Sequence, residues 1–139
     1  MKLNNIIILE DDAIEVRRVP TFKKLPQDGL TYLGGFIANK KITDRTPIEI
    51  KYMMGINELD LEKYQMVMTL SYYIPTWEVA LDILNNILYK KRYRAIDIEL
   101  TKSTKIYYQF PACFTEVPDA PSNIRENKKK HSNDRYQWV

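Results

Sequence analysis

A block running from Tyr64 to Leu100 constrains the fold most, because the spacing of its apolar residues changes twice. Apolar and polar residues alternate over Tyr64–Tyr73, which is the period of a β-strand with one apolar face. Apolar residues then recur at intervals of three, four and seven over Thr76–Tyr89, which is the period of an amphipathic helix. Alternation returns over Ile96–Leu100. The block therefore predicts a strand, a helix and a second strand.

The helix in this block has a recognisable start and one apolar stripe. Thr76 follows Pro75 and can accept a hydrogen bond from an amide of the first turn, where Glu78 suits the helix dipole. The stripe consists of Trp77, Ala80, Leu81, Leu84, Ile87 and Leu88. Burying these side chains would contribute on the order of 10 kcal/mol before entropy is counted. We therefore expect the helix to lie on a sheet and its stripe to be scaffold, not a functional site.

Shorter strands are predicted on both sides of the block. Ile6–Leu9 and Ala13–Val19 flank the acidic turn Glu10–Asp12 and are expected to form a hairpin. The other predicted strands are Leu30–Ala38, bent or bulged at Gly34-Gly35, and then Pro47–Met54, Lys105–Phe110 and Arg135–Val139. Two connectors are predicted between them: a loop over Pro20–Gly29 anchored by Phe22, and an acidic stretch over Gly55–Lys63.

These elements predict an α+β fold: a mostly antiparallel sheet with one main amphipathic helix (about 76–89) packed on one face, and extended termini. The chain has 139 residues, of which 45% are hydrophobic and 28% charged, values that suit a single globular domain. We place that domain at residues 1–122. Residues 123–139 are expected to form a basic loop and a C-terminal strand or arm.

The cysteine count and the apolar runs bear on the compartment. Cys113 is the single cysteine, whereas secreted domains of this size often carry several in pairs. The apolar run Ile6–Leu9 is cut short by acidic residues, so no signal peptide is expected. No stretch approaches the roughly 20 apolar residues of a membrane helix. We expect a reducing, cytosolic setting and no contact with a membrane.

Residues that carry catalytic or metal chemistry are few. The only histidine, His131, lies in the basic tail, which argues against a catalytic triad or a histidine-rich metal site. Cys113 is interpreted as a small buried hydrophobe, because no histidine is placed to activate it. Glu10–Asp12 lacks the spaced oxygens of a calcium loop, and Gly34-Gly35 lacks the flanking residues of a phosphate loop. We expect no enzyme, no cofactor and no metal.

The net charge is only +3, but basic residues gather in two places. These are Arg17, Arg18, Lys23 and Lys24 near the start, and Lys128, Lys129 and Lys130 near the end. The second group could contact phosphates while Tyr136 and Trp138 stack on bases. The alternative is a solvated basic loop followed by an edge strand, and short charge runs more often have that explanation.

The order of residues in the block resembles one protein family. Met66–Tyr73 as a strand, Trp77–Leu88 as a helix and Tyr93–Leu100 as a second strand are similar to the tail-terminator, or tail-sheath-stabilising, proteins of contractile-tailed bacteriophages. Val19-Pro20, Leu25-Pro26 and the tryptophan-bearing Arg135–Trp138 also have counterparts in that family, so the likeness covers roughly two thirds of the chain. The chain is short for the family, lacks its region after the tryptophan strand, and has a basic loop of its own.

The resemblance implies a structural virion subunit, not an enzyme. Such a subunit forms a ring, expected to be hexameric, that terminates or connects the tail tube or sheath at the neck or tail end after assembly in the host cytoplasm. Its partners would be copies of itself and other tail or neck proteins. Sheet edges and extended ends are the expected joints, because unpaired backbone groups can continue a sheet between subunits.

Two sets of residues are assigned to these surfaces. The expected subunit-interface residues are Arg135, Tyr136, Gln137, Trp138 and Phe22. The basic residues expected to face passing DNA are Arg17, Arg18, Lys128, Lys129 and Lys130. An alternative function is a small phage-encoded protein that binds nucleic acid or acts in host takeover. A small hydrolase is a third reading, but it needs a polar catalytic cluster that these residues do not supply.

Overall fold

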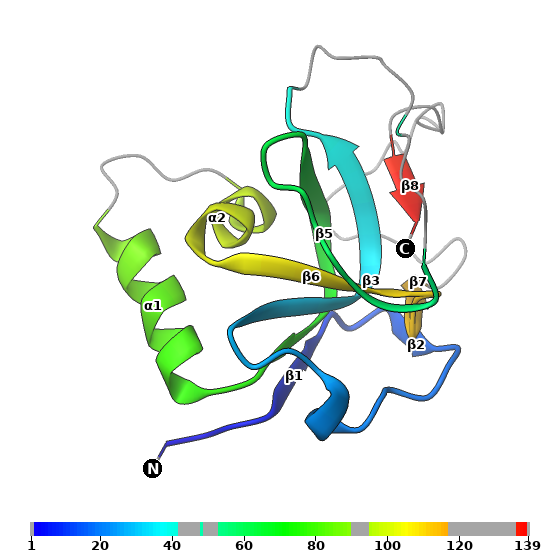
Figure 1. Ribbon diagram of the computed structural model, residues 1–139, viewed down its shortest axis with the longest axis horizontal. Helices are drawn as coiled ribbons and strands as arrows, with labels where there is room; N and C mark the ends of the chain where they lie inside the picture. The colour runs from blue at the N-terminus through cyan, green and yellow to red at the C-terminus, as the bar shows by residue number, and fades with distance from the viewer. Residues whose placement is uncertain (1, 42–47, 49–52, 90–94, 117–135, 139) are drawn as a thin grey trace.

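The computed structural model describes residues 2–41, 48, 53–89, 95–116 and 136–138 of the chain (Figure 1). The strands are β1 (Ile6–Leu9), β2 (Ala13–Glu15), β3 (Gly29–Asn39), β4 (Gly55–Glu58), β5 (Tyr64–Ile74), β6 (Lys105–Phe110), β7 (Phe114–Glu116) and β8 (Tyr136–Trp138). The helices are α1 (Trp77–Leu88), α2 (Ile96–Ser103) and the short 3-10 turn η1 (Phe22–Lys24). This is an α+β fold dominated by sheet, which confirms the predicted fold class.

The main sheet is organised around β3 and β5, its two long strands. Its order is β1-β5-β3-β6-β4, and every pair is antiparallel except β3 with β6. β6 pairs with the first part of β3, and β8 pairs with Phe36–Ala38 farther along. Because β5 occupies the other edge of β3 there, β8 extends the row that β6 begins. The predicted C-terminal strand thus pairs within its own chain.

Both faces of β3 are covered, which explains why nearly every residue of that strand is buried. One face carries the larger core cluster, which joins β3, β5 and β6 to the two helices through residues such as Tyr32, Met66, Ile83, Leu100 and Ile106. The other face carries a second cluster of Leu25, Leu33, Tyr73, Cys113 and Phe114. There the small β2–β7 sheet and the segment that follows β2 form the cover (Figure 1). The strand therefore lies between two layers.

The predicted bulge at Gly34-Gly35 is confirmed, and it has a counterpart on β5. Gly34 pairs with Ser71 and Phe36 with Val67, so Gly35 alone faces the three residues from Met68 to Leu70. Met68 has a φ of 77°, a conformation that costs energy in a residue other than glycine. Its amide donates to Asp97 Oδ2 of α2 at 3.2 Å. The unusual backbone conformation of Met68 is therefore stabilised by a hydrogen bond to α2, outside the sheet.

The predicted hairpin near the N-terminus is wrong, although both of its strands exist. β1 pairs with β5, whereas β2 pairs with β7 in the separate two-stranded sheet. The turn between them is attached to β5 instead, since the Glu10 amide donates to Leu70 O at 2.9 Å and the Thr69 hydroxyl donates to the Glu10 carboxylate. With these tertiary bonds in place, β1 lies in the main sheet and β2 lies in the two-stranded sheet.

The prediction of a second strand in the block is also wrong, because Ile96–Ser103 is the helix α2. Of the three alternating apolar residues only Leu100 enters the core, and Ile96 is exposed. Asp97 lies in the first turn, where its carboxylate accepts from the Ile98 amide at 2.8 Å as well as from Met68. A carboxylate there satisfies amides that have no partner inside a helix. Polar bonds of Asp97, one of them to the distant Met68, thus override the strand pattern.

Two further predictions concern the region before β5. Residues 55–58 were expected in an acidic connector but form β4, which pairs with β6. Of the strand predicted over Pro47–Met54, residues 47 and 49–52 lie outside the described part of the chain, and Met53 and Met54 are exposed and not in a strand. Tyr64–Ile74 and Lys105–Phe110 are strands as predicted. The position of β4 in the chain is set by its pairing with β6, which the local sequence pattern does not reveal.

Gly34 offers a direct test of how closely β3 approaches β7. A Cβ at this position would lie 2.4 Å from the carbonyl oxygen of Phe114 and 3.0 Å from Ser71 Oγ. We expect Gly34→Ala to lower the free energy of unfolding by about 3 kcal/mol or more, because backbone atoms must move apart. Urea-induced unfolding followed by circular dichroism would measure the loss.

Gly55→Ala is the matched control for that substitution. Gly55 has a φ of 99°, but a Cβ there has no heavy atom within 4 Å. Its cost should come from backbone strain alone, about 1–2 kcal/mol. Equal losses in the two variants would contradict the close approach of β3 and β7.

Candidate functional site: an exposed apolar face on α1

The helix α1 forms where it was predicted, with Thr76 as its cap. The Val79 amide donates to Thr76 Oγ1 at 3.3 Å, and Glu78 lies in the first turn. α1 does not lie directly on the sheet, however. It packs mainly against α2, which covers β5, and its own contact with β5 is slight (Figure 1). The helix is therefore the outermost element on that side of the molecule.

The prediction that this apolar stripe is buried is wrong, because α1 packs a different side against the core. Its buried residues are Val79 and Ile83, with Ile87 packed beside them, at the spacing of one helical face. The Asn86 side chain points the same way and donates to Ser103 O at 3.0 Å. At about 100° per residue, this face is turned by roughly a quarter of a circle from the predicted stripe. The packing of α1 against α2, not apolar spacing alone, selects the buried side.

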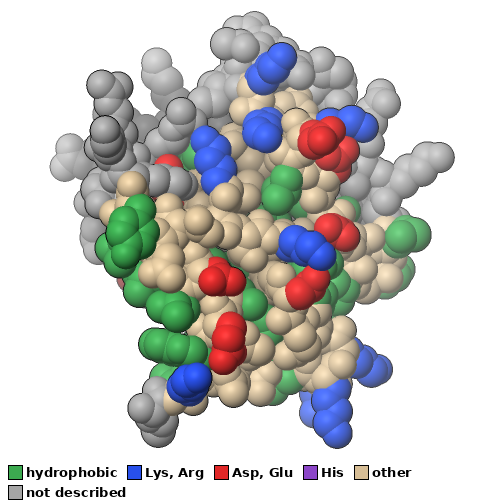
Figure 2. All heavy atoms as spheres, turned by 60° about the vertical axis from the view of Figure 1, so that its left-hand side comes forward, with side chains coloured by type: hydrophobic (Ala, Val, Ile, Leu, Met, Phe, Trp, Pro, Cys, Tyr) green, Lys and Arg blue, Asp and Glu red, His purple; other side chains and the backbone are tan. Residues whose placement is uncertain are grey.

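The other large apolar residues of α1 point outward and form what we call the α1 outer face: Trp77, Leu81, Leu84 and Leu88. Leu84 is 49% exposed and Leu88 is 56% exposed, whereas Ile83, which directly precedes Leu84, is 6% exposed. Figure 2, which brings the α1 side of the molecule forward, shows hydrophobic side chains gathered in a column there. Single exposed apolar residues are ordinary, but a contiguous row on one helix is typical of an interaction surface.

Acidic side chains border the α1 outer face. Glu78 and Asp82 lie one turn apart on the solvent side of the helix, next to the apolar row. Lys2 Nζ lies 3.9 Å from Glu78 Oε1, but both side chains are mostly exposed, so this ion pair contributes little to stability. Figure 2 shows acidic side chains beside the hydrophobic column. The surface therefore combines an apolar row with negative charge.

A second exposed surface has the opposite charge and lies on the segment from Ile14 to Lys24, which we call the 14–24 segment. Its outward-facing apolar residues are Ile14, Val16 and Phe22, and its exposed basic residues are Arg17, Arg18, Lys23 and Lys24. Glu15 is the exposed acidic residue among them. The segment is firmly attached, because the Val16 and Arg17 amides both donate to Cys113 O, at 2.8 and 3.1 Å.

Phe22 fixes the far end of the 14–24 segment. Its ring stacks on Tyr73 with centroids 5.5 Å apart and planes 9° from parallel, which confirms that it anchors the loop. It nevertheless stays 42% exposed, so it remains available for contact. The Tyr73 hydroxyl donates to Asn5 Oδ1 at 2.7 Å, which ties this end of the segment to the start of β1. The segment thus presents its side chains from a fixed backbone.

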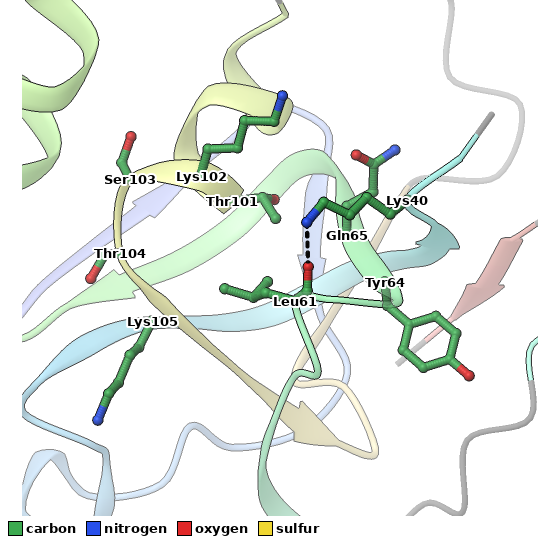
Figure 3. Close-up of a pocket in the computed structure, with 9 residues that line it drawn as sticks. All are labelled: Lys40, Leu61, Tyr64, Gln65, Thr101, Lys102, Ser103, Thr104 and Lys105. Carbon is green, nitrogen blue, oxygen red and sulfur yellow. Dashed lines mark hydrogen bonds between the residues drawn. The ribbon is translucent and has the colours of Figure 1, made fainter.

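A hollow of about 490 Å³ lies between the C-terminal end of α2 and the turn before β5 (Figure 3). Its lining consists of Lys40, Leu61, Tyr64, Gln65, Thr101, Lys102, Ser103, Thr104 and Lys105. Lys40 Nζ donates to Leu61 O at 2.8 Å, and Lys105 Nζ donates to Asp28 Oδ2 at 2.8 Å, a bond that lowers the pKa of Asp28. The Lys102 and Lys105 side chains point in opposite directions. Because the three lysines do not converge, the hollow is a weaker candidate than the α1 outer face.

The structure places the residues predicted from the sequence in different regions. Arg17, Arg18 and Phe22 share the exposed 14–24 segment. Residues 136–138 form β8 on β3, while Arg135 and Lys128–Lys130 lie outside the described residues. Sequence reasoning missed the α1 outer face by assigning its residues to the core. The surplus of apolar residues on α1 was the available signal, since Val79, Ile83 and Ile87 already complete a second stripe.

The thiol of Cys113 lies in the second core cluster and not at a surface. It is 1% exposed, and its Sγ lies 3.7 Å from Arg18 O. Burial raises the pKa of this thiol, which disfavours the thiolate needed for nucleophilic chemistry. Among the residues that the structure describes, no cluster of three or more His, Cys, Asp or Glu side chains could hold a metal.

Comparisons with known proteins give no relative for this chain. Neither the protein-family models, nor the curated proteins, nor the solved structures include a significant match. In the described part of the chain, neither helix has the length and apolar character needed to cross a membrane. The two exposed surfaces are therefore defined by the geometry and chemistry of their own residues.

The neighbouring residues Ile83 and Leu84 test which side of α1 is structural. Ile83→Ala should lower the free energy of unfolding by about 2–4 kcal/mol, because it removes buried methyl groups and leaves a cavity. Leu84→Ala should change it by less than about 0.5 kcal/mol in the monomer, since the side chain is half exposed. Urea unfolding at low protein concentration would measure both. A larger loss for Leu84→Ala would show that the helix is turned the other way.

The buried thiol gives a second test. We expect Cys113 in the native protein to react with a maleimide at pH 7 at least about 100-fold more slowly than in urea, because burial limits access and holds the thiol protonated. Mass spectrometry of the labelled protein over time would measure both rates. Rapid native labelling would contradict the packing of the 14–24 segment over Cys113.

Proposed function

We propose that this chain is a structural subunit, without catalytic activity, that assembles with copies of itself into a ring. In the version that the resemblance suggests, the ring is hexameric and terminates or connects the tail tube or sheath of a contractile-tailed bacteriophage at its neck or tail end. Other tail or neck proteins would contact its two sides. The chain would function in the virion after assembly in the host cytoplasm.

The α1 outer face is the observation that carries this proposal. It exposes four large apolar side chains in one row on a well-formed helix. Leaving such a row in water forgoes roughly 25 cal/mol for each Å² of apolar surface that a partner could cover. Subunits of permanent assemblies commonly have apolar contact surfaces of this kind. A surface that is not needed for the fold of the monomer is therefore available for assembly.

The resemblance to tail terminators is supported by part of the block and weakened by another part. The strand Tyr64–Ile74 and the helix Trp77–Leu88 stand where the family pattern has them. The next element is the helix Ile96–Ser103, and a strand follows only at Lys105. The phage context thus rests on the strand and helix together with the tryptophan-bearing β8. The ring-forming role rests on the exposed surfaces.

The alternative is a protein that binds nucleic acid, either alone or in host takeover. The four exposed basic residues of the 14–24 segment favour it, because Lys and Arg side chains supply the salt-dependent part of such binding. If these residues contact phosphates, the affinity for DNA of the isolated monomer should fall about 10-fold or more between 50 and 200 mM salt. A ring subunit should show weak binding at most.

Counting the chain in purified particles tests the proposed function. We expect mass spectrometry of intact phage particles to find the chain at a fixed copy number equal to one ring, six copies if the ring is hexameric. Native mass measurement of the isolated protein should show the same oligomer at high concentration. Absence of the chain from particles, with a monomer that binds DNA, would replace this proposal by the alternative.

A further inference from the structure

We propose that the α1 outer face of one copy docks on the 14–24 segment of the next copy, so that the ring closes through one repeated head-to-tail contact. This inference rests on the proposed function and names the two surfaces that meet. The occupant of the α1 outer face is therefore a second copy of this chain and not an unrelated partner.

Both surfaces supply apolar side chains that the monomer leaves in water. The α1 outer face contributes Trp77, Leu81, Leu84 and Leu88, and the 14–24 segment contributes Ile14, Val16 and Phe22. Each of these side chains is between 38% and 56% exposed. Phe22 and Trp77 are aromatic, and aromatic anchors with an apolar surround are typical of the centre of an interface. Contact between the two surfaces would cover both rows at once.

Their charges are complementary. Glu78 and Asp82 border the row on α1, whereas the 14–24 segment carries the exposed basic residues Arg17, Arg18, Lys23 and Lys24 next to its apolar residues in the sequence. Opposite charges at the rim of a contact raise the association rate and suppress wrong pairings. The single exposed Glu15 leaves the segment strongly positive. The acidic rim of one surface thus has basic partners on the other.

The same charges disfavour pairing of α1 with α1. A two-fold contact would bring Glu78 and Asp82 of both copies together; among the described residues, Lys2 forms an ion pair with Glu78. Like charges across an interface cost free energy. α1 also lies on the opposite side of the molecule from β2, the strand in which the 14–24 segment begins (Figure 1). A contact between two different patches repeats from copy to copy, and it forms a closed ring when the rotation between copies closes and an open filament when it does not.

Rigid backbones on both sides support docking without rearrangement. α1 is capped by Thr76 and held to α2 through Asn86. The 14–24 segment is held by two bonds to Cys113 O and by the stacked pair Phe22–Tyr73. Ordering a loop on binding costs free energy that a fixed surface does not incur. The two surfaces therefore already have the form in which they can meet.

Site-directed crosslinking tests the contact directly. Leu84→Cys and Val16→Cys each place one thiol at the middle of a surface, and a short bis-maleimide would join them across the interface. We expect covalent dimers when the two variants are mixed, and no dimer from either variant alone. A chain carrying both substitutions should give a ladder that stops at the ring copy number. Buried Cys113 should stay unmodified in every sample, since it is 1% exposed.

Lys63→Cys is the matched control, because that side chain is 71% exposed and lies in the turn before β5. Mixed with Leu84→Cys it should give no dimer above background. Dimers from Leu84→Cys alone would overturn the head-to-tail contact in favour of a two-fold one. The absence of any mixed dimer while native mass shows an oligomer would overturn the contact and leave the ring function standing. A monomer at every concentration would overturn the contact and count against the ring as well.

Charge exchange provides an independent test. Glu78→Lys with Asp82→Lys should weaken self-association about 10-fold or more, and Lys23→Glu with Lys24→Glu should do the same. Mixing the two doubly substituted chains should restore mixed assembly, because the charges are again complementary. Analytical ultracentrifugation at 50 mM salt would measure all three samples. If the mixture assembles no better than either variant alone, the two surfaces do not face one another.

Discussion

The irregular pairing of β3 with β5 is the constraint on which the rest of the structure depends. β3 is covered on both faces, so it cannot bend toward solvent, and the mismatch with β5 is absorbed at Gly35 and Met68–Leu70. Gly34 lets the β7 backbone approach within a distance that any Cβ would block. The second cover, formed by β2, β7 and the 14–24 segment, can therefore lie close to the sheet.

The same irregularity determines where the helices lie. The exposed amide of Met68 is bonded to Asp97, and this bond holds the first turn of α2 against β5. The Thr101 hydroxyl, one turn later, donates to Asp97 O at 3.0 Å and lies over the same strand. α2 occupies the face of the sheet that α1 was expected to cover. α1 is displaced outward, so only Val79, Ile83 and Ile87 reach the core, and the other apolar residues remain at the surface.

This explains how much of the fold the sequence could predict. The extents of β5, β6 and α1 follow from periodicity and from Thr76, because these signals are local. The pairing of β1 and the helical state of Ile96–Ser103 depend on bonds to Leu70 and Met68, which are distant in the sequence. The apolar surplus of α1 was visible, but its assignment to core or surface required the position of α2. The basic charge of the 14–24 segment is visible in the sequence. Its fixed backbone is not, because it depends on hydrogen bonds to Cys113 and on stacking against Tyr73.

In the proposed ring, a helix face is a better joint between subunits than a sheet edge. The outer strands of the main sheet, β1 and β4, have four residues each, and such short edges give few backbone bonds to a neighbour. β8, which belongs to the predicted C-terminal arm, pairs with β3 of its own chain. The α1 outer face, in contrast, presents apolar side chains over three turns of a helix that is already formed in the single chain. For the proposed assembly, side-chain contacts bordered by opposite charges are therefore a stronger basis than continuation of the sheet.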